Sequence, residues 1–138
     1  MRNDALVPAR FLTLSAHFVL LVTLLWARED NIRACLPWGF SDADYARKDT
    51  EIVVGLSLAI LLVVFELVGF FSGISMFFPS QALLSIAAHC AASIALAYYV
   101  VESWGCAGYW WIFAFCSVLP AFAELCIVVG VLVLGRTP

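Results

Sequence analysis

The residues of this sequence most suited to chemistry are two histidines and two glutamates that stand alone inside long apolar stretches. They are His17, Glu66, His89 and Glu124. Imidazole and carboxylate groups can relay protons, bind a transition metal ion or hydrogen-bond to one another. An ionisable group inside a bilayer costs about 2.5 to 3.5 kcal/mol on insertion scales, so such residues mark either a functional site or a specific pairing between helices.

Each of the four apolar stretches is long enough to cross a membrane as a helix. They cover residues 11–27, 52–72, 82–101 and 110–134, and roughly 20 apolar residues span the ~30 Å of hydrocarbon. Apolar residues make up 64% of the chain and charged residues 12%, which leaves too little polar surface for a soluble fold. Continuous apolar runs also exclude a β-barrel. We therefore predict an all-α membrane protein, a four-transmembrane-helix bundle with antiparallel up-down topology, as a single domain over residues 1–138.

Little of the chain lies outside these stretches. The longest remaining segment is the loop 28–51, which has no room for a soluble catalytic domain. The net charge is -3 and the 7 Lys and Arg residues are scattered, unlike the basic patch of a nucleic-acid-binding surface. We expect a protein that is not an enzyme, with the lipid bilayer around it and with no nucleic-acid partner, cofactor, metal or small-molecule substrate.

The two membrane faces differ more in aromatic residues than in positive charge. Basic residues are nearly balanced, with Arg2, Arg10 and Arg136 on the face of the termini and Arg28, Arg33, Arg47 and Lys48 on the face of the long loop. Every Trp and Tyr falls on the loop face, where such rings prefer the headgroup level. We expect both termini in the cytoplasm and the loop 28–51 outside it.

Small residues share the helical face of the ionisable groups. The residues expected to pack helix against helix are Gly55, Ala59, Gly69 and Gly73 in the second span, and Ala88 and Ala92 in the third. In the second span the spacing puts these residues on one side of the helix together with Glu66. The pattern Gly69-x-x-x-Gly73 is typical of close backbone approach between membrane helices. The carboxyl group of Glu66 is therefore expected to face another helix rather than lipid.

The short connection between the second and third spans makes them neighbours, so Glu66 and His89 are the expected pair. His17 is then expected near Glu124 or near both. Pro120 cannot donate to the carbonyl of Cys116, which predicts a helix kink one turn before Glu124. Two interpretations of this polar seam remain open: a His/Glu network that locks the bundle, or a functional site such as a proton relay or a metal cluster. We favour locking, because sequence does not show the convergence of ligands that a metal needs.

The cysteines and the long loop give two further expectations. Cys35 and Cys106 fall on the same membrane face in different loops, so a disulfide between them is possible if that compartment is oxidising. The other cysteines, at 90, 116 and 126, are expected to be small buried apolar residues. In the loop, Ser41 followed by Asp44 is typical of a helix start, so the second helix is expected to begin before the membrane. This makes the loop the best candidate surface for a protein partner.

Several blocks of residues resemble one known family. The blocks are Arg10-Phe11-Leu12-Thr13-Leu14, Asn31-Ile32-Arg33-Ala34-Cys35-Leu36-Pro37, Glu66-Leu67-Val68-Gly69-Phe70, Ser72-Gly73-Ile74-Ser75-Met76-Phe77, Ala88-His89-Cys90, and Tyr109-Trp110-Trp111-Ile112-Phe113 through Leu119-Pro120. In this order, over nearly the whole chain, they resemble the transmembrane protein 107 family. The tail departs from the resemblance, since Arg136 is its one basic residue where the family has several.

The resemblance implies a four-span protein with both termini in the cytoplasm, located at the transition zone at the base of the primary cilium. It implies a non-enzymatic scaffold in the Meckel syndrome module, which assembles with other transition-zone membrane and coiled-coil proteins. That module forms the gate that controls ciliary membrane composition and Hedgehog signalling. The resemblance transfers no catalytic role to Glu66, His89 or Pro120. The alternative function is a small transporter or channel that uses the intramembrane His/Glu seam.

Overall fold

The computed structural model describes residues 5–102 and 106–137, and these parts of the chain are helical with connecting turns. In chain order the elements are α1 (Leu6–Trp26), α2 (Glu29–Cys35), α3 (Asp42–Phe71), α4 (Pro79–Val101), α5 (Cys106–Phe113), the π-helical segment η1 (Ala114–Val118) and α6 (Leu119–Leu134). Four helical stretches are long and apolar enough to cross a membrane: Leu6–Trp26, Asp42–Phe71, Pro79–Val101 and Cys106–Leu132. The predicted all-α, four-span membrane fold is confirmed.

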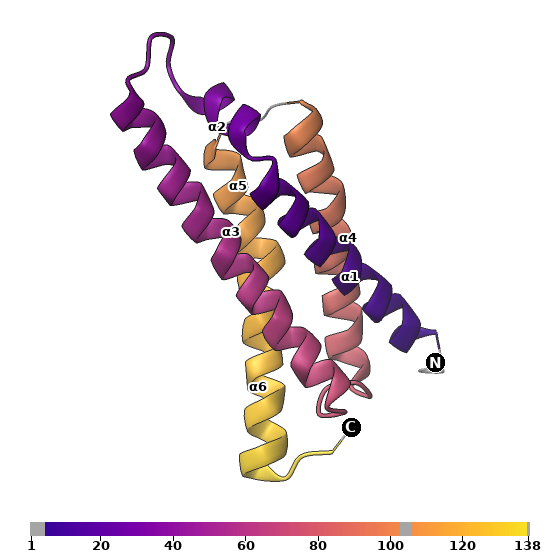
Figure 1. Ribbon diagram of the computed structural model, residues 1–138. Helices are drawn as coiled ribbons and strands as arrows, with labels where there is room; N and C mark the ends of the chain where they lie inside the picture. Colours follow the sequence, from indigo (N-terminus) through magenta and orange to yellow (C-terminus); the bar gives the residue numbers. More distant parts are fainter. Residues whose placement is uncertain (1–4, 103–105, 138) are drawn as a thin grey trace.

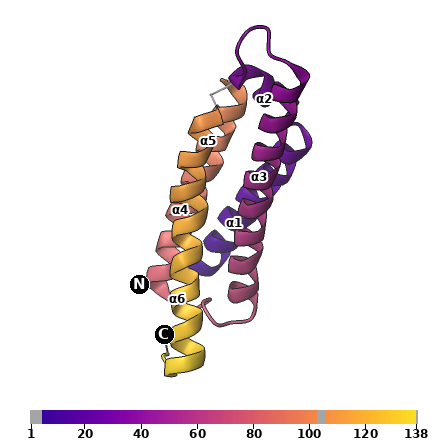
Figure 2. The ribbon, with the colours of Figure 1, turned by 90° about the vertical axis from the view of Figure 1, so that its left-hand side faces the viewer.

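The chain ascends along α1, descends along α3, ascends along α4 and descends through α5, η1 and α6 (Figure 1). Both termini lie at one end of the bundle, while α2 and the loop after it lie at the other. α1 packs against α4 and α3, and α6 packs against α3 and α4. The last turns of α6 extend beyond the start of α1 in both views (Figures 1 and 2). This offset decides which residues of α1 and α6 meet.

α3 begins at Asp42, well before the apolar stretch that starts at Ile52. Ser41 Oγ accepts from the backbone N–H of Asp44 at 3.2 Å, and the Asp44 carboxylate accepts from the Ser41 N–H at 3.2 Å. This capping box satisfies two amides that the helix start leaves without partners, and it confirms the predicted helix start at Ser41. The polar first turns of α3 therefore continue the helix beyond the apolar span.

Gly73 does not have the packing role predicted for it. α3 ends at Phe71, and Gly73 follows the end of the helix with a φ of 82°. A Cβ at Gly73 would meet nothing within 4 Å, so no helix approaches it closely. The residue is a glycine because the backbone turns there through the left-handed region, which other residues rarely adopt. The Gly-x-x-x-Gly pattern of α3 is therefore one packing glycine followed by one turn glycine.

The loop between α1 and α3 contains a helix, α2, that the sequence analysis did not predict. Its Ile32 is fully buried, and Asn31 Nδ2 donates to the backbone carbonyl of Tyr99 at 3.2 Å. Arg28 Nε donates to Asp49 Oδ1 at 2.6 Å, an ion pair that raises the pKa of Arg28. α2 is thus held against the ends of α3 and α4, and it closes that end of the bundle.

The outer surface of the bundle is apolar and its interior contains polar groups. Leu12, Val68, Phe122 and Leu132 are each more than 60% exposed, which suits side chains that face lipid. Buried residues include an arginine, two histidines and two glutamates.

Of the cysteines expected to be buried, Cys116 is buried, but Cys90 and Cys126 are exposed. A thiol is apolar enough to lie against acyl chains, so the exposed positions of Cys90 and Cys126 are compatible with a surface that faces lipid.

Candidate functional site: a buried polar cluster

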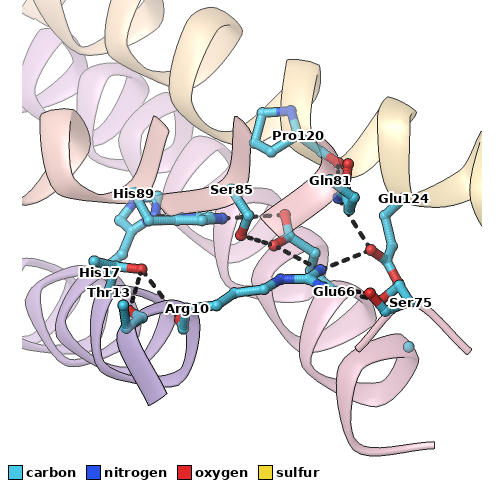
Figure 3. A network of polar contacts seen from close by, with 12 residues as sticks. Arg10, Thr13, His17, Glu66, Ser75, Gln81, Ser85, His89, Pro120 and Glu124 are labelled. Atoms are coloured by element: carbon cyan, nitrogen blue, oxygen red, sulfur yellow. Dashed lines mark hydrogen bonds and ion pairs between the residues drawn. The ribbon is translucent and has the colours of Figure 1, made fainter. Parts of the chain in front are cut away.

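One connected group of polar side chains occupies the interior of the bundle, and we call it the polar cluster (Figure 3). Its members are Arg10 and His17 of α1, Glu66 of α3, Ser75 of the turn after α3, Gln81, Ser85 and His89 of α4, and Glu124 of α6. Each is at most 2% exposed. All four membrane-spanning stretches therefore contribute an ionisable side chain to one enclosed site.

Arg10 lies at the centre of this cluster and contacts both carboxylates. Its Nη2 donates to Glu124 Oε2 at 2.8 Å and lies 3.4 Å from Glu66 Oε2. Its Nη1 donates to the backbone carbonyl of Ser75 at 3.0 Å and to Ser75 Oγ at 3.2 Å. The guanidinium carbon also lies 5.2 Å from the centre of the Phe70 ring, within the range of a cation–π contact. Arg10 thus joins α1 to α3, α6 and the turn after α3.

Arg10 is buried in the bundle and does not lie at the membrane face of the termini, where it was expected from the sequence. The assignment was wrong because α1 begins at Leu6 rather than at residue 11, which places Arg10 in the second turn of the helix. A signal was available in the spacing. The buried residues of α1 are Leu6, Arg10, Leu14, His17, Leu21 and Leu24, a spacing of three and four that places Arg10 on the same helical face as His17.

Glu66 accepts hydrogen bonds from α4 as well as from Arg10. Ser85 Oγ donates to Glu66 Oε2 at 2.5 Å, and His89 Nε2 lies 3.1 Å from Glu66 Oε1. Glu66 and His89, the two residues expected to pair, are therefore in contact. Both oxygens of the Glu66 carboxyl group are therefore within hydrogen-bond distance of a side chain of α4.

His17 contacts His89 instead of Glu124. The two Nδ1 atoms lie 2.6 Å apart, and the ring centroids are 4.8 Å apart. The expected proximity of His17 to Glu124 is replaced by the Arg10–Glu124 ion pair. Because α6 extends beyond the start of α1 (Figures 1 and 2), Glu124 lies level with Arg10 rather than with His17.

Glu124 lies between α3, α4 and Arg10. Its Oε2 accepts from Gln81 Nε2 at 3.0 Å, and the same nitrogen lies 3.4 Å from the carbonyl oxygen of Pro120. On the other side, Glu124 Oε1 lies against the Cα of Gly69, where a Cβ would overlap it. Gly69 is therefore a position where close approach requires glycine. Gln81 is a second member of the cluster that the sequence analysis missed.

Pro120 lies in the first turn of α6, directly after η1. A π-helical segment is rare and leaves backbone groups outside the regular α-helical pattern. Here it precedes a proline, which has no N–H to donate, so the irregularity and the missing donor fall in the same turn. The Pro120 carbonyl faces Gln81, so the backbone next to this irregular turn also takes part in the cluster.

The other expected packing residues differ in how closely they are approached. A Cβ on Gly55 would lie 2.8 Å from Tyr109 Cε1 and 3.0 Å from the Trp110 ring, so α5 packs tightly there. Ala59 and Ala92 are buried, at 1% and 0% exposed. Ala88 is only half-buried. Gly55 and Ala59 therefore line the face of α3 that continues from Glu66 towards α2.

A disulfide joins Cys35 at the end of α2 to Cys106 at the start of α5, with their Cα atoms 5.6 Å apart. It lies at the end of the bundle opposite the termini, away from the polar cluster. Within residues 5–102 and 106–137, no group of three or more His, Cys, Asp or Glu side chains is arranged to hold a metal ion. The contacts that the structure shows within the cluster are ion pairs and hydrogen bonds.

Comparison with known proteins gives the same family over almost the whole chain. A family model described as "TMEM107: Transmembrane protein" matches residues 6–128. Transmembrane protein 107 of Rattus norvegicus is 50% identical over 137 residues, which cover 99% of this chain and 98% of that protein. Transmembrane protein 107 of Homo sapiens is 49% identical over 137 residues, with the same coverage. No solved structure matches the chain.

Proposed function

This chain belongs to the transmembrane protein 107 family, and from that premise we propose that it is a non-enzymatic membrane scaffold of the ciliary transition zone. In this role it helps to form the gate that controls ciliary membrane composition and Hedgehog signalling. The observation that carries the proposal is the match of about half of all residues over nearly the full length of both proteins. Its partners are other membrane and coiled-coil proteins of the Meckel syndrome module.

The polar cluster supports a scaffold because it restrains the positions of the four spans relative to one another. A charged side chain that is buried and paired would leave an unsatisfied partner if its helix moved away. Arg10 contacts Glu66 and Glu124, and Glu66 contacts His89, so separation of any span would break an ion pair or a hydrogen bond. The cluster therefore locks the bundle into one shape, and the apolar outer faces of that shape are available to lipid and to partner helices.

The end of the bundle that holds α2 supports a second part of the proposal. The loop 28–51 lies outside the cytoplasm, where the Cys35–Cys106 disulfide is stable, and both termini are cytoplasmic. The first turns of α3 project from this end (Figure 1), and Trp38, between α2 and α3 in the chain, is fully exposed. An exposed tryptophan beside a fixed helix is typical of a contact residue for a protein partner.

Imaging of an endogenously tagged chain in ciliated cells tests the proposal. We expect a ring of signal at the base of the cilium, between the basal body and the axoneme. Uniform plasma-membrane or vesicular signal would contradict a transition-zone scaffold.

One observation favours a second candidate function, a small transporter or channel. Arg10, Glu66, His89 and His17 form a continuous series of polar contacts inside the bundle, and such chains can relay protons in membrane proteins. Proton uptake by liposomes that contain the purified chain would support this function if Glu66→Gln abolished the uptake. The absence of flux in liposomes with folded protein would leave the scaffold as the function.

A further inference from the structure

The formal charges of the polar cluster do not balance when both histidines are neutral. Glu66 and Glu124 each contribute a negative charge, and among residues 5–102 and 106–137 Arg10 is the one guanidinium that contacts them. His17 and His89 are the only histidines of the chain, and both belong to the cluster. Two carboxylates and one guanidinium leave one negative charge in a site that is closed to water and surrounded by hydrocarbon, where an unpaired charge is strongly unfavourable.

His89 is placed to take the proton that would remove this charge. Its Nε2 lies 3.1 Å from Glu66 Oε1, and its Nδ1 lies 2.6 Å from Nδ1 of His17. Two ring nitrogens at this distance must share a proton, because two unprotonated nitrogens would repel each other. An imidazolium donates from both nitrogens, and the two nitrogens of His89 lie against Glu66 Oε1 and against His17 Nδ1, which accepts when His17 bears its own proton on Nε2.

We propose that His89, held between Glu66 and His17, is an intramembrane proton-binding site whose bound proton makes the polar cluster electrically neutral. The positive groups are then Arg10 and His89, and the negative groups are Glu66 and Glu124. His17 is neutral, accepts from His89 through Nδ1 and bears its own proton on Nε2. This inference is independent of the choice between scaffold and transporter, since it concerns a bound proton and not proton flux.

The two carboxylates are poorer positions for the proton. Both oxygens of Glu66 already lie against Arg10, Ser85 and His89. A proton on either oxygen would point at one of these donors and would remove the hydrogen bond that the carboxylate accepts from it. Glu124 Oε2 faces the donors Arg10 and Gln81.

The remaining carboxylate oxygen, Glu124 Oε1, offers no better position. It lies against Gly69 and has no hydrogen-bond partner among the described residues, so a proton on it would find no acceptor there. At His89 the same proton gives the ring a second N–H, so that one nitrogen donates to Glu66 and the other to His17.

Glu66 of α3 contacts the histidine pair and links it to groups from the other spans. Glu66 contacts Arg10 of α1 and Ser85 of α4 directly, and it is linked to Glu124 of α6 through Arg10. The hydrogen bond between the two Nδ1 atoms also lets the proton move from His89 to His17 while the other contacts stay in place. The pair therefore binds one proton in common, with the position on His89 favoured by its contact with Glu66.

Nitrogen NMR of the histidine rings tests the proposal directly. The full chain, labelled with ¹⁵N-histidine and reconstituted in phosphatidylcholine vesicles, gives signals from only two rings. At about pH 7.5, above the ordinary pKa of histidine near 6.5, we expect one imidazolium and one neutral ring. Two neutral rings, or two imidazolium rings, would overturn the proposal, and this measurement requires no variant that could fail to fold.

Charge variants then distinguish two explanations for a protonated His89: the total charge of the polar cluster, or its contact with Glu66 alone. Glu124→Gln removes one negative charge without altering any group in contact with a histidine, and we expect the imidazolium population to fall from about one ring in two to near zero. Ser85→Ala removes a hydrogen bond from Glu66 but no charge, and it should retain the imidazolium. Persistence of the imidazolium in a helical, correctly folded Glu124→Gln chain would refute the charge balance.

A third variant identifies the protonated ring. In His17→Gln the amide oxygen can accept from His89 Nδ1, so the single remaining ring should still be an imidazolium at about pH 7.5. A neutral ring in this variant would contradict the assignment of the proton to His89. Circular dichroism of each variant in the same vesicles provides the control for folding.

Discussion

Glu124 Oε1 lies against the Cα of Gly69, in the space that a Cβ would occupy. The carboxylate that pairs with Arg10 on one side is therefore held by bare backbone on the other. α6 and α3 meet here at the depth of the polar cluster, and a side chain at position 69 would have to displace the Glu124 carboxylate. One glycine thus leaves the space in which a buried carboxylate contacts Arg10 and Gln81.

Gly69→Ala should destabilise the protein, because the added methyl group displaces the Glu124 side chain from Arg10 and Gln81. We expect a loss of about 1 to 3 kcal/mol for the overpacking alone, measured by SDS titration of the purified protein in mixed micelles. Gly108→Ala is the matched control, since a Cβ there would meet nothing within 4 Å. Equal stability of the two variants would show that α3 and α6 are not in close contact at Gly69.

Arg10→Gln should be among the most destabilising single changes in the chain. It leaves Glu66 and Glu124 buried without their cation, and removal of one partner from a buried ion pair costs about 3 to 5 kcal/mol. The double variant Arg10→Gln/Glu124→Gln should recover part of that loss, because it removes a negative charge as well. SDS titration followed by far-UV circular dichroism measures both effects.

The control for this charge removal is Arg33→Gln. The Arg33 side chain is 59% exposed and pairs only with Glu29 of its own helix among its described ion pairs. Exposed pairs of this kind contribute little to stability, so the midpoint of the SDS titration should be the same as for the unaltered chain. If Arg10→Gln had an effect as small as that of Arg33→Gln, Arg10 would not be buried in the cluster.

Glu66 and His89 should show coupled effects in a double-mutant cycle. Their contact of 3.1 Å is buried on both sides, and residues in one hydrogen-bond network usually couple by about 0.5 to 3 kcal/mol. The cycle uses Glu66→Gln, His89→Asn and the double variant, with unfolding free energies from SDS titration. Additive losses would indicate that the two side chains do not interact in the membrane.

The spans and the contact between Glu66 and His89 could be predicted because both depend on local pattern. Continuous apolar runs give the helices, and a short connection makes α3 and α4 neighbours, which brings Glu66 close to His89. Gly69 could be predicted as a packing residue because it shares a helical face with Glu66. These features require only helical periodicity and the thickness of a bilayer.

The central role of Arg10 could not be reached in the same way, because it depends on where helices begin and how far they extend. The apolar run begins after Arg10, so hydropathy places this residue at the membrane surface, whereas α1 begins at Leu6. The partner of Glu124 depends on the axial offset of α6 against α1, which no local pattern records. The same limit applies to Gly73, whose backbone conformation decides its role and is not visible in a Gly-x-x-x-Gly spacing.

Cys35→Ser should lower the stability of the protein in an oxidising compartment and change its migration. The Cys35–Cys106 bridge has a sequence separation of 71, and a loop of that length restricts the unfolded chain by about 4 kcal/mol in the chain-entropy estimate. On a non-reducing gel the unaltered chain should run faster than the same chain after reduction, and Cys35→Ser should remove that difference.

Cys126→Ser is the matched control for this change, because Cys126 is a free, exposed cysteine of α6. It should keep both the gel shift and the stability of the unaltered chain. The bridge attaches α2 to α5, so its loss should also free the loop 28–51 and increase cleavage there by an added protease, whereas the polar cluster at the other end should remain intact. A gel shift that persists in Cys35→Ser would mean that it arises from cysteines other than Cys35, and it would contradict the Cys35–Cys106 bridge.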